Sequence, residues 1–529
     1  MKVISLHSLG HDAGVSYFDD GVLQFSIEAE RLSRIKHDGR VSRALQHMLG
    51  VAGVDPAGVD LIAVSTPVSR KLLEIPDIDR AMAAISQGAM HFRTTSTMLG
   101  RPTDCVVVTH EVSHAALAAH YAGNTDGCVV LVNEGRGEIT RSSLFRVEGS
   151  RLEWIERDPM PWYGNGFGWS ALGFLFGFGK GPSVAGRVMA LGGYGQPRAD
   201  VRGILLDVDP AVIRDPRIAD ATYASLSARP EFSHDFGTMA DAVATFQELF
   251  TEQVYEVLAR HVGTPATVDV ALGGGCALNI IANSALRQRL QRDIAIPPAC
   301  GDSGQSLGAG IYALKYVLGQ PVFPFSVYSN GRPEMSQVSA SALVAAGLSV
   351  QEYDGAAAAR VLARGGVVAF LDGAAELGPR ALGHRSLLGD PSAPGMRKRM
   401  SESLKRREWF RPLGAVIRRE RFGALFGGQP PSPYMLFNYD LPEGVFPEAR
   451  HADGSSRLQT LDQPEHPRLH DLLAQFEELT GTAGLINTSL NGPGVAIAHS
   501  TADMLHDFVN SDVNLFVSGD LMSYGFGAP

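Results

Sequence analysis

Two histidines four residues apart, His110 and His114, stand in the alanine-rich stretch "VVVTHEVSHAALAAHYAG" at residues 106–123. The composition favours a helix, and residues i and i+4 lie on the same face of a helix. Two imidazoles on one face suit a shared metal ion, because imidazole is a common transition-metal ligand. A hydrogen-bonded pair inside a core, or a chance spacing, explains the same pattern. The spacing alone leaves these three interpretations open.

Glycine-rich turns precede two predicted helices. "VDVALGGGCALN" predicts a strand, a turn at Gly273, Gly274 and Gly275, and a helix that begins near Cys276. The free N–H groups and the dipole at a helix start favour an anion such as a phosphate. The turn is no Walker loop, because no Lys-Ser or Lys-Thr pair follows it. A second turn, "CGDSGQSLGAG", places Asp302 at the start of another helix. Together the two turns favour a nucleotide cleft, although either turn alone is weak evidence.

Positive charge is concentrated in one part of the second half. Residues 380–419 hold eleven Lys or Arg against three acids, in a chain whose net charge is −10. A solvated basic helix explains part of this surplus, and "GMRKRMSESLKRREWF" predicts one. Arg380 and Arg385 instead stand in the turn "GPRALGHRS", where a guanidinium is well placed to grip a phosphate through two parallel bonds. The later stretch "GLINTSLNGPG" predicts a strand and a polar loop, which either binds an anion or is a simple Asn/Ser turn.

The elements that must position these residues repeat. "VISLHSLGHDAGVSYFDDGVLQFSIEAER" and "GCVVLVNEGRGEITRSSLFRVEGSRLEWI" each predict strand, turn, strand, tight turn, strand. We therefore expect two related α/β halves, the alternative being two unrelated hairpins. The pattern restarts near residue 350, so we expect one domain over residues 1–345 and a second over residues 346–529. A chain of 529 residues is too long for one ordinary core.

Composition excludes several classes of protein. Hydrophobic content of 45% and charged content of 19% are typical of a soluble globular protein. A net charge of −10 argues against general nucleic-acid binding. The four cysteines show no CxxC spacing, so disulfides and a structural zinc are not expected. Neither a signal-peptide apolar region nor an uninterrupted apolar run of about 18 residues is found, so we expect a cytoplasmic protein without a membrane span.

Many ordered motifs resemble those of the NodU/CmcH carbamoyltransferases. In the first half they are "HDAGVSYF", "EAERLSRIKH", "HEVSHA", "GRVMALGGYG" and "GGGCALN"; in the second they are "GPRALGHRSLLGDP", "REWFRPLGAVI", "SPYML", "HADGSSRLQT" and "NTSLNGPG". The resemblance implies an N-terminal duplicated domain of the actin-like (ASKHA-type) ATPase superfold and a C-terminal YrdC-like α/β domain. It implies transfer of a carbamoyl group from carbamoyl phosphate to a hydroxyl, through a carbamoyl-adenylate made with ATP and Mg²⁺.

The resemblance also assigns residues. It implies His11 at the transfer site, as the base or as the group that orients the acceptor hydroxyl; otherwise His11 is a turn histidine bonded to backbone. It favours a metal site, of Fe²⁺ or another divalent transition metal, at His110, His114, Asp302 and Asn133. We expect nucleotide contacts in the glycine turns, at Gly273, Gly274, Gly275, Asn279 and Gly135. We expect carbamoyl phosphate and ATP contacts in the second domain, at Arg380, Arg385, Lys405, Arg411, Arg457, Asn487 and Ser489.

The chain departs from the family pattern at several positions. Asn133 stands where the family has an aspartate; it keeps an amide oxygen but loses the charge, and Glu134 is a substitute ligand. Ala374 replaces an arginine, and Val495 stands where a carboxylate is usual. Because of these losses, an altered metal affinity, an altered substrate and weak activity are three alternative expectations. Arg380, Lys405, Asn487 and Ser489 are retained, so an enzyme is still expected.

Other functions are weighed against this one. A nucleotide-binding regulator of the actin-like superfold has no use for a phosphate pocket built from Arg380, Arg411 and Asn487. Threonylcarbamoylation of tRNA predicts a basic RNA surface, which the net charge disfavours. The motifs do not specify the acceptor, and family context implies a hydroxylated natural product such as an antibiotic, sugar or macrolide. The segment "WYGNGFGWSALGFLFGFGKG" either lines its pocket or packs in the core. The oligomeric state is open, with a homodimer as one alternative.

Overall fold

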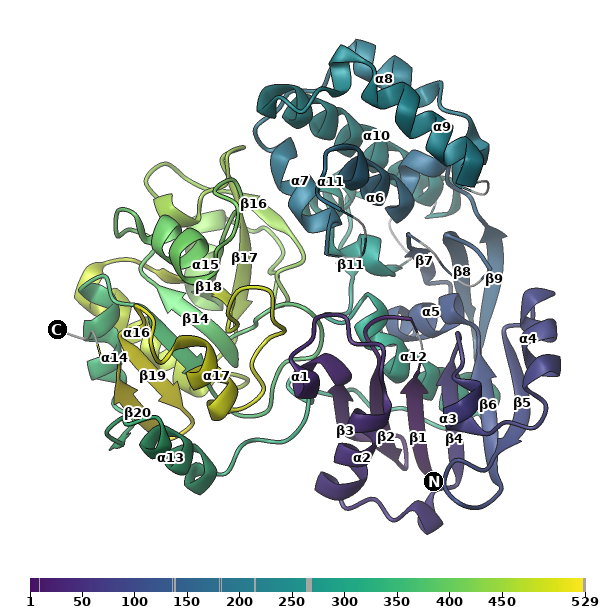
Figure 1. Cartoon of the computed structure of the whole chain (residues 1–529), viewed down its shortest axis with the longest axis horizontal. Coiled ribbons are helices and arrows are strands. Elements are labelled where there is room, and N and C mark those ends of the chain that lie inside the picture. Colours follow the sequence, from purple (N-terminus) through teal and green to yellow (C-terminus); the bar gives the residue numbers. More distant parts are fainter. Residues whose placement is uncertain are drawn as a thin grey trace.

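Three β-sheets organise the chain, and helices pack against each of them (Figure 1). The computed structural model describes residues 1–526 except residues 9, 136, 138, 180, 182, 214–215 and 263–268. The first sheet has the order β3-β2-β1-β4-β6-β5, with β1 at Lys2–His7, β2 at Gly14–Asp19, β3 at Val22–Glu28, β4 at Leu61–Ser65, β5 at His91–Ser96 and β6 at Thr103–Val108. The second has the order β11-β10-β7-β8-β9, with β7 at Val129–Asn133, β8 at Ser142–Glu148, β9 at Arg151–Arg157, β10 at Val270–Gly273 and β11 at Ile294–Ala295.

The first two sheets repeat one connectivity. Each opens with an antiparallel meander, β1-β2-β3 in the first and β7-β8-β9 in the second. A later strand then pairs in parallel with the first strand of each meander, β4 with β1 and β10 with β7. The two meanders predicted from the sequence are therefore confirmed, and the shared strand order shows that they belong to two similar halves.

Two helices lie between these sheets and carry the residues at the centre of the first unit. Helix α5 (His110–Tyr121) packs on β7 and β10, α12 (Gln305–Ile311) packs on β1 and β4, and the two helices pack on each other. Their backbones touch at Gly308, where an added Cβ would lie 2.0 Å from the Ser113 carbonyl oxygen. Only glycine permits this approach, which brings the start of α5 close to the start of α12.

A helical lobe extends from the second sheet and is drawn in blue and teal at the top of Figure 1. It is formed by α6 (Gly166–Leu175), α7 (Ala185–Gly192), α8 (Ala199–Leu206), α9 (Pro216–Ser227), α10 (Phe236–Val262) and α11 (Ile280–Leu290). Smaller helices accompany the first sheet, namely α1 (Ala29–Ser33), α2 (Ser42–Val51), α3 (Arg70–Leu73) and α4 (Ile78–Ser86). In the aromatic stretch of α6, Trp169 is 4% exposed and its ring lies 4.9 Å from that of Phe246, so part of this stretch is core.

The second unit is built on a nine-stranded mixed sheet. Its order is β12-β20-β19-β13-β14-β18-β15-β17-β16, with β12 at Gln351–Glu352, β13 at Val368–Leu371, β14 at Arg385–Gly389, β15 at Gly414–Arg418, β16 at Asn438–Asp440, β17 at Ser455–Leu461, β18 at Gly484–Ser489, β19 at Leu515–Ser518 and β20 at Leu521–Tyr524. Its helices are α13 (Ser336–Ala345), α14 (Gly355–Ala363), α15 (Arg419–Phe426), α16 (Pro467–Thr480) and α17 (Thr501–Phe508). The helix expected in the basic stretch is a short π-helical segment, Lys398–Leu404.

The contacts of α13 show to which of the two units this helix belongs. This helix packs on α17 and β20, which belong to the second unit. By its packing α13 therefore belongs to the second unit, although its residues were expected to end the first domain at residue 345. The hydrophobic pattern restarts only after α13, which explains why the sequence suggests the later position.

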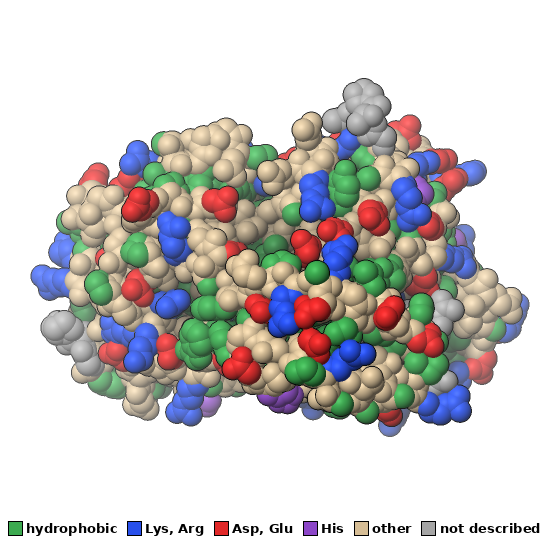
Figure 2. All heavy atoms as spheres, turned by 90° about the horizontal axis from the view of Figure 1, so that it is seen from above, with side chains coloured by type: hydrophobic (Ala, Val, Ile, Leu, Met, Phe, Trp, Pro, Cys, Tyr) green, Lys and Arg blue, Asp and Glu red, His purple; other side chains and the backbone are tan. Residues whose placement is uncertain are grey.

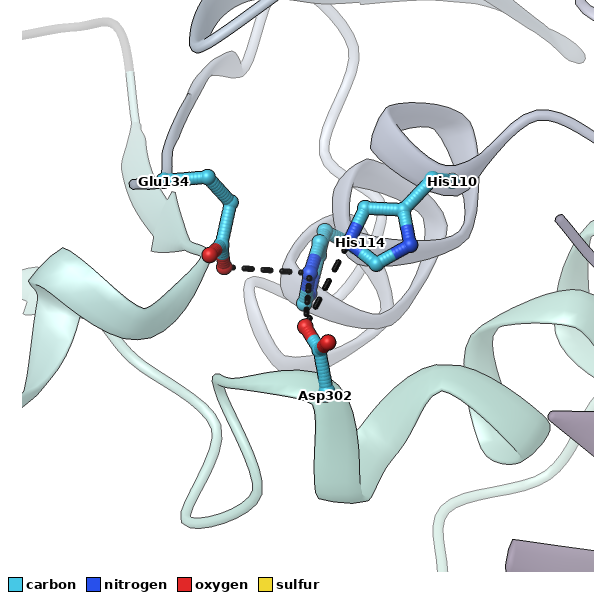
Figure 3. Close-up of side chains that lie close together, drawn as sticks. All are labelled: His110, His114, Glu134 and Asp302. Atoms are coloured by element: carbon cyan, nitrogen blue, oxygen red, sulfur yellow. Dashed lines mark ion pairs between the residues drawn. The ribbon is translucent and has the colours of Figure 1, made fainter. Parts of the chain in front are cut away.

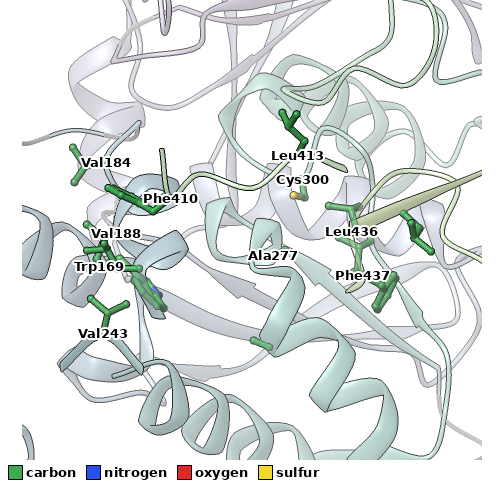
Figure 4. Packing of buried hydrophobic residues seen from close by; sticks show 14 of the residues in the cluster. Trp169, Val184, Val188, Val243, Ala277, Cys300, Phe410, Leu413, Leu436 and Phe437 are labelled. Carbon is green, nitrogen blue, oxygen red and sulfur yellow. The ribbon is translucent and has the colours of Figure 1, made fainter. Parts of the chain in front are cut away.

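The two units share an apolar contact. Phe410 and Leu413 of the second unit belong to the same buried cluster as Trp169, Val184 and Val188 of the helical lobe (Figure 4). The centres of the Phe236 and Phe410 rings lie 6.0 Å apart. Burial of aromatic side chains from both units holds the lobe and the second unit together.

A buried ion pair joins the two units at a second point. Arg31 is fully buried, contacts Glu28 at 3.2 Å and donates to the carbonyl oxygen of Gly378 at 2.6 Å. The Gly378 N–H donates to Glu28 at 2.8 Å, so the pair is bonded to the second unit from both sides.

Removing this arginine is expected to destabilise the protein. Arg31→Ala leaves Glu28 buried without its partner, which costs about 3–5 kcal/mol. Thermal denaturation is expected to show a clearly lowered melting temperature. Arg70, which pairs with the exposed Asp79 at 2.5 Å, supplies the control, and Arg70→Ala is expected to leave the melting temperature unchanged. Equal melting temperatures for both variants would contradict the role given to Arg31.

Two properties of the structure bear on the membrane-spanning and nucleic-acid-binding classes of protein, which the sequence disfavours. No helix among the described residues combines the length and apolarity needed to span a membrane. Figure 2 shows acidic and basic side chains interspersed over the face that it presents. The described part of this face therefore lacks the single-sign basic surface that nucleic-acid binding uses.

Candidate functional site

His110 and His114 lie in the first two turns of α5. Their ring centres are 4.9 Å apart, and the exposed fractions are 4% for His110 and 1% for His114. Nδ1 of His110 lies 3.1 Å from the carbonyl oxygen of Thr66. A proton on that nitrogen leaves the Nε2 lone pair of His110 directed at the neighbouring carboxylates.

Two carboxylates face these imidazoles (Figure 3). Asp302 precedes α12, and its Oδ1 lies 3.3 Å from Nε2 of both His110 and His114. Glu134 follows β7, and its Oε1 lies 3.1 Å from Nε2 of His114. One ligand atom from each of the four side chains falls within 4.8 Å of all the others.

The arrangement fits a transition metal. Nε2 of His110 and both ring nitrogens of His114 are buried and lack a hydrogen-bond partner among the described residues, although the carboxylates are near. Buried polar atoms are normally satisfied, so these nitrogens point to a ligand. Two imidazoles and two carboxylates suit iron(II), manganese or zinc. Although burial raises the pKa of Asp302, its closeness to His110 and His114 holds that pKa well below its usual value.

Asn133 lies beside this cluster and not within it. Its amide nitrogen donates to the carbonyl oxygen of Gly164 at 2.9 Å, which turns that end of the side chain away from the imidazoles. Glu134, the next residue, faces His114 instead. The structure therefore adds Glu134 to the candidate ligand set, and the Asn133 Oδ1 atom is buried without a hydrogen-bond partner among the described residues.

Loss of one imidazole is expected to remove the metal. His114→Ala leaves three side chains in a closed site, and a purified preparation is expected to hold far less metal than the wild type by elemental analysis. His120, on the same helix and outside the cluster, supplies the control variant His120→Ala, which is expected to retain metal. Equal metal content in the wild type and His114→Ala would exclude this site.

His11 lies at the edge of the same cluster. Its side chain is 44% exposed, and Nδ1 lies 2.8 Å from Oδ2 of Asp12 and 3.4 Å from Oδ2 of Asp302. The hydrogen bond that His11 donates to Asp12 raises the pKa of His11 to about 9. His11 thus stands between the metal cluster and a large cavity that it lines.

That cavity lies between the two units and has a volume of about 1310 Å³. Three of the expected nucleotide residues, Gly135, Gly275 and Asn279, line it, whereas Gly273 and Gly274 do not. An added Cβ at Gly274 would lie 2.3 Å from the Asn133 carbonyl oxygen, so this glycine permits close chain packing.

The helix after the glycine turn starts later than expected. A 3₁₀ turn at Gly275–Leu278 precedes α11, which begins at Ile280 and not near Cys276. Asn279 caps α11 by accepting from the Ala282 N–H at 3.1 Å. The glycines therefore lead into a 3₁₀ turn, and both ends of the Asn279 amide are bonded to protein, since its nitrogen donates to Gln247 Oε1 at 3.0 Å.

The opposite wall of the cavity is cationic. Most of the expected phosphate residues lie on it, namely Arg380, Lys405, Arg411, Arg457, Asn487 and Ser489. Lys405 donates to Ser489 Oγ at 2.8 Å and to Asn491 Oδ1 at 2.9 Å. Arg407 lines this wall too, and the sequence analysis missed it because Arg407 is one of several cations in "KRREW". Burial, followed by Arg411 and Arg380, lowers the pKa of Arg407 to about 9.

These cations lack balancing charge. Burial and three neighbouring arginines hold the pKa of Arg457 well below its usual value. Among the described residues no carboxylate forms an ion pair with Arg380, Lys405, Arg407 or Arg457, while Arg411 pairs only with Glu408 at 3.6 Å. A group of buried and half-buried cations with few acids is an anion site by its charge.

Arg385 belongs elsewhere. It is fully buried on β14 and donates to the carbonyl oxygens of Asp372, Gly373, His384 and His499. It does not line the cavity. Arg385 thus fastens neighbouring loops, and we remove it from the candidate anion site.

Comparison with known proteins identifies the family of this chain. The chain matches the carbamoyltransferase N-terminus family over residues 2–71 and 94–311 and the carbamoyltransferase C-terminus family over residues 359–524. It is 28% identical to the 3′-hydroxymethylcephem-O-carbamoyltransferase of Amycolatopsis lactamdurans over 97% of each chain. It is 30% identical to nodulation protein U of Rhizobium fredii over 93% of this chain and 90% of that one. A solved structure, the activator of 2-hydroxyisocaproyl-CoA dehydratase from Clostridium difficile, covers 59% of this chain and 94% of its own, with 14% identity and a TM-score of 0.36.

A two-unit α/β architecture with a cavity between a His/carboxylate cluster and a cationic wall defines a group-transfer enzyme. The chain belongs to the carbamoyltransferase family. It is therefore an enzyme that transfers carbamoyl groups, which decides against the regulatory alternative.

Proposed function

We propose that this enzyme moves a carbamoyl group from carbamoyl phosphate to a hydroxyl of a small natural product, using ATP. The observation that carries the proposal is the shared cavity, with unbalanced buried cations on one wall and His11 beside the metal cluster on the other. The two anionic substrates require the cations of the first wall, and a hydroxyl acceptor requires a proton acceptor such as His11 on the second. We further propose an actin-like fold for the first unit and a YrdC-like fold for the second.

The reaction proceeds in three balanced steps. Hydrolysis of carbamoyl phosphate at the cationic wall gives carbamate and inorganic phosphate. A carbamate oxygen then attacks the α-phosphorus of ATP, forming carbamoyl-adenylate and releasing pyrophosphate. Attack of the acceptor hydroxyl on the carbamoyl carbon breaks the bond to the phosphate oxygen and releases AMP. A cavity enclosed by both units protects carbamate and adenylate from water.

The residues divide between these steps. Arg380, Arg407 and Arg457 hold phosphate oxygens and stabilise the negative charge that develops during cleavage. Gly135, Gly275 and Asn279 face the nucleotide, and Mg²⁺ accompanies ATP. The neutral form of His11 accepts the proton of the acceptor hydroxyl.

The metal site serves the transfer end of the cavity. His110, His114, Glu134 and Asp302 would hold iron(II) or another divalent transition metal. Such an ion would supply Lewis-acid polarisation of a nearby oxygen. Its place next to His11 puts that polarisation where the acceptor is deprotonated.

A direct assay tests the proposal. Purified enzyme is incubated with carbamoyl phosphate, ATP and Mg²⁺ and a panel of acceptors: 3′-hydroxymethylcephem, an amino sugar, a macrolide and glycerol at molar concentration. Mass spectrometry is expected to find one acceptor heavier by a carbamoyl group, with AMP and pyrophosphate formed. ATP breakdown at a rate that does not depend on carbamoyl phosphate, with no carbamoylated product, would contradict the proposal.

A further inference from the structure

A chain of hydrogen bonds leads from His11 through Asp12 and His37 to Ser183, and all four residues line the cavity. His11 Nδ1 lies 2.8 Å from Asp12 Oδ2, and His37 Nδ1 lies 2.9 Å from Oδ1 and 3.0 Å from Oδ2 of the same aspartate. His37 Nε2 lies 2.7 Å from Ser183 Oγ. One carboxylate thus joins two imidazoles that come from different segments of the first unit.

The backbone supports this arrangement at some cost. Both Asp12 and His37 have φ values of +56°, in the left-handed region that side-chain-bearing residues rarely adopt. The Ala13 N–H donates to the Asp38 carbonyl oxygen at 2.8 Å, which ties the two turns together. Residues held in such conformations by their surroundings are often functional.

The free end of His11 faces the cavity. Nδ1 is occupied by Asp12, and Nε2 lacks a hydrogen-bond partner among the described residues. The charged groups around the ring are Asp12, Asp302 and Glu134, with His37 beyond Asp12. Nε2 is therefore the nitrogen available to an acceptor hydroxyl.

We propose that Asp12 and His37 are positioning residues for His11: Asp12 fixes the tautomer and stabilises the imidazolium, and His37 holds Asp12 in place. The inference rests on the proposed function, in which His11 receives the acceptor proton. As the acceptor oxygen bonds to the carbamoyl carbon, its proton moves to His11 Nε2, and AMP leaves with the electrons of the broken carbon–oxygen bond. Asp12 accepts the hydrogen bond from the Nδ1–H group throughout and stays ionised, as a carboxylate that orients a catalytic histidine does.

Ser183 ends the chain of hydrogen bonds. Together with His37 and Asp12 it has the connectivity of a nucleophile, a base and an orienting acid. The aspartate, however, is shared with His11, and His11 is the imidazole beside the metal cluster. We therefore assign Ser183 no step in the transfer, and the experiment below separates the two roles.

The test compares two acceptors. One is the hydroxylated panel member that the wild type carbamoylates; the other is hydroxylamine, which attacks carbamoyl-adenylate without prior loss of a proton and gives hydroxyurea and AMP. Asp12→Asn is expected to lower kcat for the hydroxyl acceptor by about 100-fold or more. It is expected to leave the acceptor KM, the metal content and hydroxyurea formation within about threefold of wild type. His37→Gln is expected to show the same selective defect at about tenfold.

Ser183→Ala is the matched control and is expected to transfer at a rate within about twofold of wild type. Equal losses with both acceptors, or loss of adenylate formation, would make Asp12 structural and overturn the inference. An Asp12→Asn variant that carbamoylates the hydroxyl acceptor at the wild-type rate would overturn the inference as well. Loss of transfer in Ser183→Ala together with a carbamoylated Ser183 in the wild type would replace it by a serine nucleophile. A wild type that forms neither carbamoyl-adenylate nor AMP would instead contradict the proposed function.

Discussion

Arg380→Ala is expected to lower carbamoyl phosphate cleavage by about 100- to 1,000-fold, the usual cost of removing one stabiliser of developing charge. Arg380 is half-buried on the cationic wall, and its Nε is buried without a hydrogen-bond partner among the described residues. Within the same part of the chain, its only hydrogen bond to protein is from a terminal nitrogen to the Leu278 carbonyl oxygen at 3.4 Å. Most donors of this guanidinium are therefore available to an anion. Phosphate release from carbamoyl phosphate is the measurement.

Two further variants define the role of Arg380. Arg380→Lys keeps a charge but loses the planar fork, so an intermediate rate is expected. Arg364, an exposed arginine at the end of α14 and outside the cavity, supplies the control, and Arg364→Ala is expected to match the wild type. Cleavage by Arg380→Ala at the control rate would remove Arg380 from the site.

His11→Ala is expected to separate the two ends of the cavity. Adenylate formation depends on the cationic wall, so the variant is expected to consume carbamoyl phosphate and ATP at a rate near that of the wild type. Transfer to the hydroxyl acceptor is expected to fall by about 100- to 10,000-fold, the usual contribution of a general base. AMP-containing products and carbamoylated acceptor are measured in one reaction mixture.

The outcome for His11 has clear alternatives. His506, an exposed histidine on α17, supplies the control variant His506→Ala, which is expected to behave as wild type in both measurements. A joint loss of adenylation and transfer in His11→Ala would place His11 in a shared step or in the fold. If neither rate fell, His11 would be a turn residue and the base would lie elsewhere.

The local signals in the sequence were sufficient for several parts of this enzyme. Alternating apolar residues and Gly-containing turns specified both meanders, since strand periodicity and turn chemistry are local properties. The i, i+4 spacing placed His110 and His114 on one face of α5 for the same reason. The ordered motifs identified the carbamoyltransferase family, which the comparisons bear out.

Tertiary structure decided which side chains meet. Asn133 and Glu134 are neighbours in the chain, and only the direction of the backbone after β7 turns Glu134 toward His114. Arg380 and Arg385 share one turn, yet one faces the cavity and the other is enclosed by four carbonyl oxygens. The pairing of Asp12 with His37 joins turns that are far apart in the sequence. Composition and spacing report local conformation. Burial, charge balance and long-range contacts depend instead on how the sheets and helices pack, and that packing decides which residues form the site.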